Sequence, residues 1–316
     1  MEKSLEKARK NSATISRSRV ERSELKKACE TVGIEPLIPQ PPGDTRWFGE
    51  LRNAEAWVRI QEGAELHQIR AKSRGKMIQM THDDWSNLKA FIAILKPFHS
   101  ASMIEQGDSY VTISASIPII LTLNQKMNAY VRNPDNIGYG IGFAKKILAS
   151  LEDRFGRNLS FLEKKPYCLA TFADPRFFRV YYSNDSRIEA AREKVIGWVK
   201  EETENSTQSE SSPTSQPSDN ANEPDEFWGW FDSQQKSATL DTFQSIDSEI
   251  SSWGKSSALS RNTDPIHAMN GLKRDFPSIN HIFGKYCVIL ATQNADELLF
   301  SIEARNTGPL CRSIKI

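Results

Sequence analysis

Apolar residues recur at helical spacing in several stretches of this 316-residue chain. The clearest stripe lies in residues 83–98, where large apolar side chains are three or four positions apart. They are Trp85, Leu88, Ile92, Leu95 and Phe98. Because this spacing puts side chains on one face of a helix, it predicts a helix that faces a core. Pro97, near the end of the stripe, is expected to kink or stop that helix.

Further stretches predict helices and the connectors between them. Residues 2–32 are rich in helix formers, and Gly33 offers a stop. Residues 34–43 contain four prolines, which predict an extended connector. Residues 137–157 carry another apolar stripe, and residues 187–200 predict a short helix.

The pattern is less clear in two places, the start of the helix near residue 44 and the type of element over residues 111–130. Helix is expected to resume near Asp44 and Thr45, since either side chain can cap the first amides that come after it. Residues 111–130 begin with strand-like, β-branched side chains and continue with helix-like ones. Periodicity alone does not separate strand from helix in this segment.

One segment has a composition unlike the rest of the chain. Residues 201–226 hold eight acidic side chains, six serines and three prolines, with no basic residue and no aliphatic side chain larger than Ala. Such a segment cannot bury enough surface to offset its ordering entropy, so it predicts a disordered acidic linker. It separates a basic helical segment (1–33) and a helical domain (44–200) from a helical C-terminal segment (227–316). Phosphorylation of its serines would add negative charge, but a passive tether is the simpler interpretation.

Composition and charge narrow the class of protein. A hydrophobic fraction of 38% with 26% charged residues is ordinary for a globular protein, and the net charge of +1 points to no partner. Residues 1–27 nevertheless hold nine Lys and Arg against four Glu. This end could contact phosphate, although a solvated helix face is the favoured interpretation.

The four cysteines and the apolar runs argue against a zinc-binding protein, a disulfide-rich protein and a membrane-spanning protein. The cysteines lie far apart, without the spacing of a zinc site or a disulfide framework. No apolar run approaches the roughly 20 residues that span a bilayer. We therefore expect a soluble intracellular protein without a membrane partner, and no motif points to a small-molecule substrate.

A series of short motifs occurs in a fixed order along the chain. They are Asp44-Thr45-Arg46-Trp47, Leu95-Lys96-Pro97-Phe98, Ala170-Thr171-Phe172-Ala173-Asp174-Pro175-Arg176-Phe177, Asp264-Pro265-Ile266, Phe276-Pro277-Ser278-Ile279, Ala291-Thr292 and Glu297-Leu298-Leu299-Phe300-Ser301. In this order the series resembles the hAT family of DNA transposases. The match is best over 262–303, which resembles the C-terminal dimerisation region of that family.

The resemblance implies a fold that is mainly α-helical. It would be the helical insertion-type body of a hAT transposase, with a remnant of the ribonuclease-H-like core at the C-terminus. It also favours helix over strand for residues 111–130. The chain would start behind the part of the family that carries a zinc finger and the first two catalytic Asp, so we expect those parts to be missing.

Glu297 falls where the family carries its third catalytic acid. Two-metal cleavage of a strand needs several carboxylates around a pair of ions about 3.5–4 Å apart. One Glu cannot hold two such ions in octahedral oxygen coordination, and Leu298 replaces the Arg of the family. We therefore expect no enzyme activity, metal site or cofactor in this chain alone. Mg²⁺ would act only if a missing catalytic region completed the site.

The resemblance also implies residues for self-association. The apolar positions that would pair two copies are Ile279, Ile282, Phe283, Tyr286, Leu299, Phe300 and Ile302. Ala268 and Met269 stand where the family carries a pair of Trp, which removes two large anchors from such an interface. Self-association is the inherited activity that we expect.

Two other motifs have a functional and a structural interpretation. Arg46 and Trp47 could contact DNA, by a phosphate contact and by stacking on a base, but packing of Trp47 in the helical core is favoured. Asp174, which precedes Pro175 and Arg176, is interpreted as a helix cap rather than a ligand.

The leading hypothesis is a non-catalytic, transposon-derived protein that self-associates, with weak DNA contact as an addition. One alternative is the C-terminal part of an active transposase whose finger and first two acids lie outside this chain. Another is a decayed fragment without a function, with which Leu298 and the lost Trp pair agree. A nuclear location follows only from the resemblance.

Overall fold

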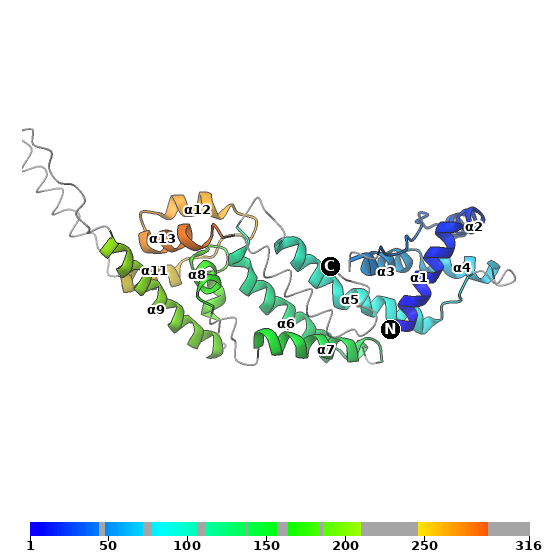
Figure 1. Cartoon of the computed structure of the whole chain (residues 1–316), viewed down its shortest axis with the longest axis horizontal. Helices are drawn as coiled ribbons and strands as arrows, with labels where there is room; N and C mark the ends of the chain where they lie inside the picture. The colour runs from blue at the N-terminus through cyan, green and yellow to red at the C-terminus, as the bar shows by residue number, and fades with distance from the viewer. Residues whose placement is uncertain are drawn as a thin grey trace, which may run out of the picture. The chain divides into compact units, whose positions relative to one another are not determined.

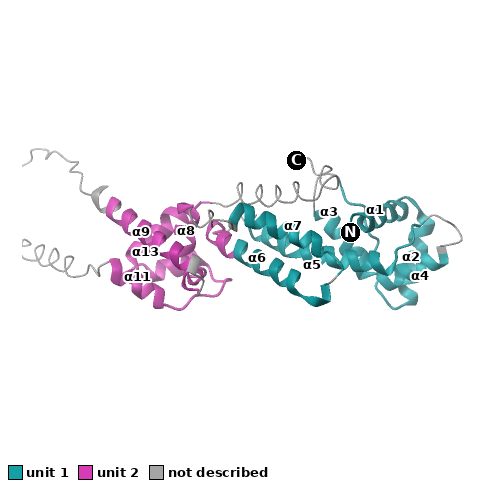
Figure 2. Ribbon diagram, turned by 90° about the horizontal axis from the view of Figure 1, so that it is seen from below, with its two compact units in different colours: residues 1–107, 119–158, 292–316 teal, residues 108–118, 159–291 magenta. Residues whose placement is uncertain are grey.

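The structure is a computed structural model that is mainly α-helical, as the sequence predicts (Figure 1). The residues that it describes are 1–43, 48–71, 77–105, 111–136, 138–156, 164–183, 186–209 and 246–289. Within these ranges there are helices and turns and no strand. The helices form two compact units (Figure 2).

The first unit contains the N-terminal helices. They are α1 (Glu2–Arg17), α2 (Arg19–Thr31), α3 (Phe48–Arg59), α4 (Gln61–Ala71), α5 (His82–Glu105), α6 (Ser116–Arg132) from residue 119 on, and α7 (Ile141–Leu151). A short 3-10 helix, Pro134–Asn136, precedes α7, and a π-helical turn, Glu152–Gly156, extends it. Residues 34–43, predicted as an extended connector, form neither helix nor strand.

The single helix predicted over residues 2–32 is wrong, because Ser18 interrupts it. Ser18 has an extended backbone (φ −108°, ψ 111°), and its Oγ accepts a hydrogen bond from the amide of Glu21 at 3.3 Å. A serine with Glu three residues later is the sequence signature of a helix start, so the signal was present in the sequence. The break lets α1 and α2 pack against each other and against different neighbours.

Two tryptophans form the centre of the first unit. Trp57 of α3 and Trp85 of α5 are both buried, with ring centroids 6.4 Å apart. Trp57 Nε1 donates to the Ala8 carbonyl at 3.1 Å and to Ser12 Oγ at 2.8 Å. Asn53 also donates to Ser12 Oγ at 2.6 Å. A buried polar network therefore joins α3 to α1 and satisfies the indole nitrogen of Trp57.

Helices α2 and α4 approach each other closely at Gly63. A Cβ at this position would lie 2.6 Å from Cys29 Sγ and 2.8 Å from Cys29 Cα, so only glycine fits. Burial raises the pKa of the Cys29 thiol, which keeps it protonated. Glu21 of α2 and His67 of α4 also meet: Glu21 Oε2 lies 3.1 Å from His67 Nε2, and both side chains are buried.

Helix α5 is fixed to α1 through Asp84. Its carboxylate accepts from the Thr81 amide at 2.8 Å, from Ser4 Oγ at 2.8 Å and from Lys7 Nζ at 2.5 Å. Burial alone would raise the pKa of Asp84, but these hydrogen bonds outweigh it and lower the pKa to about 2. The same carboxylate thus caps α5 and pairs with α1.

Pro97 was expected to kink or stop α5, and the structure shows that it does not stop the helix. The helix continues to Glu105 with Pro97 inside it. Proline removes the amide that would bond to the carbonyl of Ala93, and Ala93 is exposed. On the exposed side of the helix, water can donate a hydrogen bond to that carbonyl, so the helix tolerates the proline.

The second unit is built around α8. Its elements are the 3-10 helix η2 (Ile113–Ala115), α8 (Lys165–Ala173), the 3-10 helix η6 (Phe178–Tyr182), α9 (Ser186–Ser209), α11 (Ile246–Lys255), α12 (Pro265–Leu272) and α13 (Pro277–Tyr286). Helix is confirmed for the ambiguous segment 111–130, as η2 and then α6. Helix α9 is longer than the predicted 187–200: residues 201–209 of the predicted linker are helical, and residues 210–226 lie outside the described part.

All six residues from Cys168 to Ala173 are buried, so α8 is enclosed on every side and forms the core of the second unit. Helices α9 and α13, η2 and η6 all pack against it. Trp253 of α11 is also buried, and its Nε1 donates to the Phe172 carbonyl at 2.9 Å. Its ring lies 4.7 Å from Phe178 and 5.0 Å from Phe276, centroid to centroid. Trp253 therefore anchors the C-terminal helices to α8.

Candidate functional site

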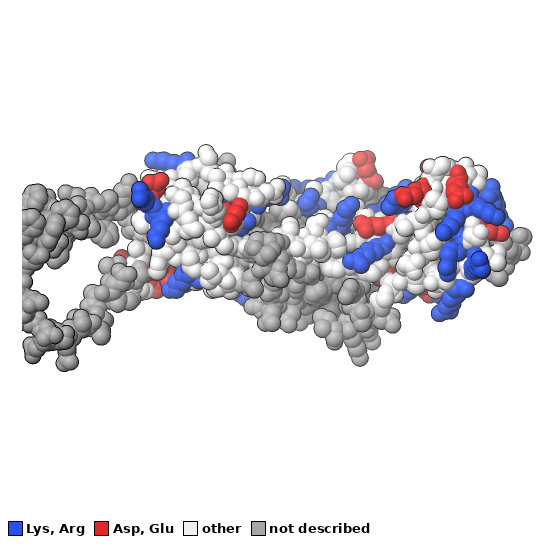
Figure 3. Space-filling model, turned by 90° about the horizontal axis from the view of Figure 1, so that it is seen from above, with Lys and Arg blue, Asp and Glu red and all other residues white. Residues whose placement is uncertain are grey.

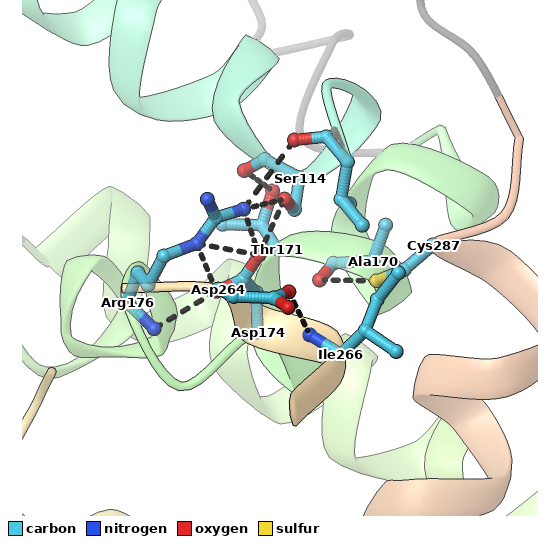
Figure 4. Close-up of polar contacts among 9 residues, drawn as sticks. Ser114, Ala170, Thr171, Asp174, Arg176, Asp264, Ile266 and Cys287 are labelled. Carbon is cyan, nitrogen blue, oxygen red and sulfur yellow. Dashed lines mark hydrogen bonds and ion pairs between the residues drawn. The ribbon is translucent and has the colours of Figure 1, made fainter. Parts of the chain in front are cut away.

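A buried group of polar side chains, joined by hydrogen bonds and an ion pair, surrounds Asp174 at the end of α8 (Figure 4). Asp174 is fully buried, and Arg176 exposes only 6% of its side chain. Arg176 Nη2 lies 2.7 Å from Asp174 Oδ2, and Arg176 Nε donates to Oδ1 at 3.0 Å. The backbone amide of Arg176 donates to Oδ1 at 2.8 Å. Carboxylate and guanidinium thus form a bidentate ion pair.

This ion pair reaches across to η2, which lies far from it in the sequence. Ser114 Oγ donates to Asp174 Oδ2 at 2.6 Å, and Arg176 Nη2 donates to the Val111 carbonyl at 3.3 Å. Thr171 Oγ1 donates to the Ser114 carbonyl at 2.9 Å. Figure 4 shows these groups converging from α8, the turn after it and η2. The cluster therefore ties η2 to the centre of the unit.

The geometry of the cluster favours a structural role over a catalytic one. Both carboxylate oxygens of Asp174 are engaged by donors, so neither is free to accept a proton from a substrate. Cys287 lies nearby, and its thiol donates to the Ala170 carbonyl at 3.5 Å. Burial, and after it the charge of Asp174, raises the pKa of Cys287 well above its usual range, so it is not a thiolate nucleophile.

The prediction that Asp174 caps the next segment agrees with these contacts. The Asp174 side chain accepts from the amide of Arg176, and its carbonyl accepts from the amides of Phe177 and Phe178. The segment after Asp174 is a turn and the 3-10 helix η6, not the α-helix that the sequence suggested. Asp264 shows the expected pattern, since it precedes Pro265 and its side chain accepts from Ile266 N at 3.0 Å.

A second buried carboxylate, Glu249 of α11, was not found from the sequence. Its Oε1 accepts a hydrogen bond from the amide of Ile279 at 2.9 Å, in the first turn of α13. Phe276 has no side-chain oxygen to cap α13, so Glu249 caps it from another helix. The only sequence signal for such a cap is that α13 begins after Phe276, which cannot cap it. That signal does not identify Glu249 as the residue that does.

A third carboxylate, Glu202, joins three helices. It accepts from Lys165 of α8 at 2.8 Å, and it pairs with Lys285 and the Tyr286 hydroxyl of α13. Burial alone would raise the pKa of Glu202, but these hydrogen bonds outweigh it and lower the pKa to about 2. Glu202 lies in residues 201–226, whose composition predicted a disordered linker. The sequence therefore did not indicate that Glu202 would join three helices.

The predicted dimerisation residues fall into two groups. Ile279 and Ile282 are fully buried within the chain, Phe283 is buried, and Tyr286 is half-buried beside Glu202. Leu299, Phe300 and Ile302 lie outside the described residues, as does Glu297. Ile279, Ile282 and Phe283 are therefore part of the core of the second unit, and Tyr286 lies at its edge.

Other side chains of the same region face outward. Ile266 of α12 is 54% exposed, and Val288 and Ile289, just after α13, are 73% and 44% exposed. With Leu259 they are the large apolar side chains that the described part of the second unit exposes. All four lie in residues 259–289, whereas the apolar faces of α8 and α11 are covered.

The remaining predicted site residues, Arg46 and Trp47, lie outside the described residues. In the part of the chain that is described, no group of three or more His, Cys, Asp or Glu side chains could hold a metal ion. None of the helices described there is long and apolar enough to cross a membrane. Neither a protein-family model nor a curated protein matches the chain.

Proposed function

We propose that this chain is a transposon-derived, non-catalytic protein that self-associates through residues 262–303. The proposal includes a ribonuclease-H-like origin for the C-terminal part and a nuclear location. It is supported by the order of the motifs that resemble hAT transposases and, in the structure, by one observation that carries most of the weight. The exposed large apolar side chains of the described part of the second unit gather in residues 259–289.

Exposure of such side chains favours an interface because water solvates them poorly. Burying apolar area stabilises an association by about 25 cal/mol per Å² before the costs of binding are subtracted. Ile266 and Val288 are each more than half exposed, so each has apolar area left to bury. The packed side chains Ile279 and Ile282 would act indirectly, by holding α13 and its exposed neighbours in place.

The test is the mass of the full-length chain in solution. Sedimentation equilibrium at tens of micromolar should give more than the 35.7 kDa of one chain. The variant Ile266→Glu/Val288→Glu should shift the mass toward one chain, because a charge at each position would be buried unpaired in the interface. Met103→Glu is the control for the single variant Ile266→Glu, since both side chains are 54% exposed but Met103 lies on α5 of the first unit.

A monomeric mass for the unaltered chain contradicts the proposal. So does an equal loss of association in the Met103→Glu control, because the effect would then not belong to residues 262–303. The variants carry substitutions at exposed positions only, so their helix content should stay unchanged in circular dichroism.

The non-catalytic part of the proposal is supported by the single acid in the matched region. Glu297 alone cannot hold two divalent ions, which strand cleavage by the family requires. The full chain incubated with supercoiled DNA and Mg²⁺ or Mn²⁺ should leave the DNA intact. Nicking that stops with a chelator and with Glu297→Ala would refute this part and leave the self-association test unaffected. DNA contact by Arg46 and Trp47 stays a prediction.

A further inference from the structure

Five cations gather where α1 ends and α2 begins. They are Arg17, Arg19, Arg22, Lys26 and Lys27, and together we call them the α2 basic face. All five are exposed. Figure 3 shows Lys and Arg gathered toward one end of the first unit, with fewer Asp and Glu among them.

The geometry of α2 fixes this face outward. Arg19, Arg22 and Lys26 are three and four positions apart, so they share one side of the helix. From Arg19 to Lys27 the helix rises about 12 Å, at 1.5 Å per residue. The buried side of the helix carries Leu25, Ala28 and Cys29, and because these side chains are fixed in the core, the cations stay exposed.

Helix α1 shows how cations are placed when they serve the fold. There Lys7 Nζ lies 2.5 Å from Asp84, Arg9 Nη2 lies 2.5 Å from Glu50, and Lys10 Nζ lies 2.7 Å from Glu6. Each of these charges is paired within the unit. They contribute to packing and leave little charge for a partner.

The five cations of the α2 basic face, of which Arg17 is the last residue of α1, differ from Lys7, Arg9 and Lys10 in their surroundings. In the described part of the chain, Arg17, Arg19, Lys26 and Lys27 lie within ion-pair distance of no carboxylate. Arg22 donates to a carbonyl, that of Ser16, at 2.6 Å. Among residues 17–30, Glu24 and Glu30 are the carboxylates that reach the surface, since Glu21 is buried against His67. Five cations with two acids leave the face positive.

We propose that the α2 basic face binds the phosphate backbone of duplex nucleic acid, without reading its sequence. A duplex presents a negative charge every few ångströms, and neutralising several of them releases condensed counterions. Long, exposed Arg and Lys side chains along about 12 Å of helix suit this repeat of charge. The proposal does not depend on self-association.

A membrane surface fits the same face less well. Helices that lie in a bilayer interface bury an apolar side among the lipids. The apolar side of α2 is already buried, with Leu25, Ala28 and Cys29 in the core. Val20, at 56%, is the large apolar side chain that α2 exposes.

The experiment measures fluorescence anisotropy of a labelled random-sequence DNA duplex with the full chain. If about five phosphates are contacted, the plot of log K against log salt should have a slope near −4.5, and affinity should fall about 500-fold between 50 and 200 mM salt. Arg19→Gln/Lys26→Gln/Lys27→Gln should make the slope shallower by about 3, since three contacts are lost. Lys89→Gln/Lys96→Gln/Lys126→Gln removes the same charge from exposed positions on α5 and α6 and should leave the slope unchanged.

Three results would overturn the proposal. One is the absence of binding at the lowest salt concentration. Another is an equal loss in the α2 and control variants, which would indicate a response to net charge alone. The third is co-sedimentation with vesicles of phosphatidylcholine and phosphatidylserine in equal parts that the α2 variant abolishes, while duplex binding stays the same in both variants.

Discussion

The second unit and helix α2 of the first unit place their charged side chains in opposite ways. In the second unit, Asp174, Glu202 and Glu249 are buried or nearly so, and each accepts from donors on other segments. In the first unit, α2 keeps one carboxylate, Glu21, inside and turns a row of cations to the outside. A buried charge must be satisfied within the protein, whereas an exposed and unpaired one remains available to a ligand. The difference separates charges that build the fold from charges that can bind.

The largest expected effect is at the buried ion pair of the second unit. Arg176→Met should destabilise the protein by about 3–5 kcal/mol, because Asp174 would remain buried without a countercharge. Urea denaturation monitored by circular dichroism measures this loss. Arg192→Met is the control: its partner Glu189 is 64% exposed and so is not left as a buried charge, and the loss should stay below about 1 kcal/mol.

A further variant sharpens the same test. Asp174→Asn/Arg176→Met removes the uncompensated charge and should recover part of the stability lost in the single variant. If Arg176→Met is no more destabilising than Arg192→Met, the cluster does not hold the second unit together.

Acid should weaken both units through one low-pKa carboxylate in each. The pKa of Glu202 and that of Asp84 are about 2 in the folded protein, below their unfolded values. The unfolded chain therefore takes up protons first, so this stabilisation is complete above the unfolded pKa and is lost as pH falls toward 2. Each group should contribute about 2 kcal/mol near neutral pH.

Urea midpoints measured between neutral pH and pH 2 test this expectation. Glu202→Gln and Asp84→Asn should each lower stability at neutral pH and flatten the acid dependence. The two effects should add, because the groups lie in different units. An acid profile that neither variant changes would show that other carboxylates control acid unfolding.

A smaller effect is expected where one helix caps another. Glu249→Ala should destabilise by about 1–2 kcal/mol, because the buried amide of Ile279 would lose its acceptor. Asp247→Ala, in the first turn of α11, removes an exposed pair with Lys200 and should change stability by about 0.5 kcal/mol or less. Thermal melts of both variants compare the two, and an equal loss would contradict the capping role.

The smallest effect on stability is expected at the exposed cations of α2. Arg19→Gln/Lys26→Gln/Lys27→Gln should alter the free energy of unfolding by about 0.5 kcal/mol or less, since these exposed side chains lose no ion pair with a described residue. A thermal melt near physiological salt measures it. A large destabilisation would mean that the α2 basic face has a role in the fold, and binding data on that variant would lose their meaning.

Local patterns predicted much of the secondary structure. The apolar stripe that begins at Trp85 lies in α5, and residues 34–43, with their four prolines, form a connector without helix or strand. The errors arose where tertiary contacts compete with local preference. Pro97 did not end α5, and Ala93, whose carbonyl would accept from the amide that proline lacks, is exposed. Residues 201–209 are helical although their composition predicts disorder, since Glu202 gains Lys165 and Lys285 as partners.

Fewer of the contacts in the candidate site could be predicted from the sequence. The structural role of Asp174 was predictable, because the residues that it caps are its immediate neighbours. Its bond to Ser114 and the bond of Glu249 to Ile279 join residues far apart in the chain, and no periodicity encodes such distances. The role of Ile279 in the core was likewise hidden, because an apolar helix face looks the same whether its partner is the same chain or another.

The sequence by itself indicated most of the helical segments and where charge is concentrated, because both depend mainly on residues within a few positions of each other. Only the tertiary structure decided which charges are neutralised. Lys7 and Arg9 of α1 meet carboxylates from α5 and α3, and the cations of α2 meet none among the described residues. Pairing depends on which surfaces the packed core brings together, and that follows from the burial of side chains such as Leu25 and Trp57 rather than from the order of the charges.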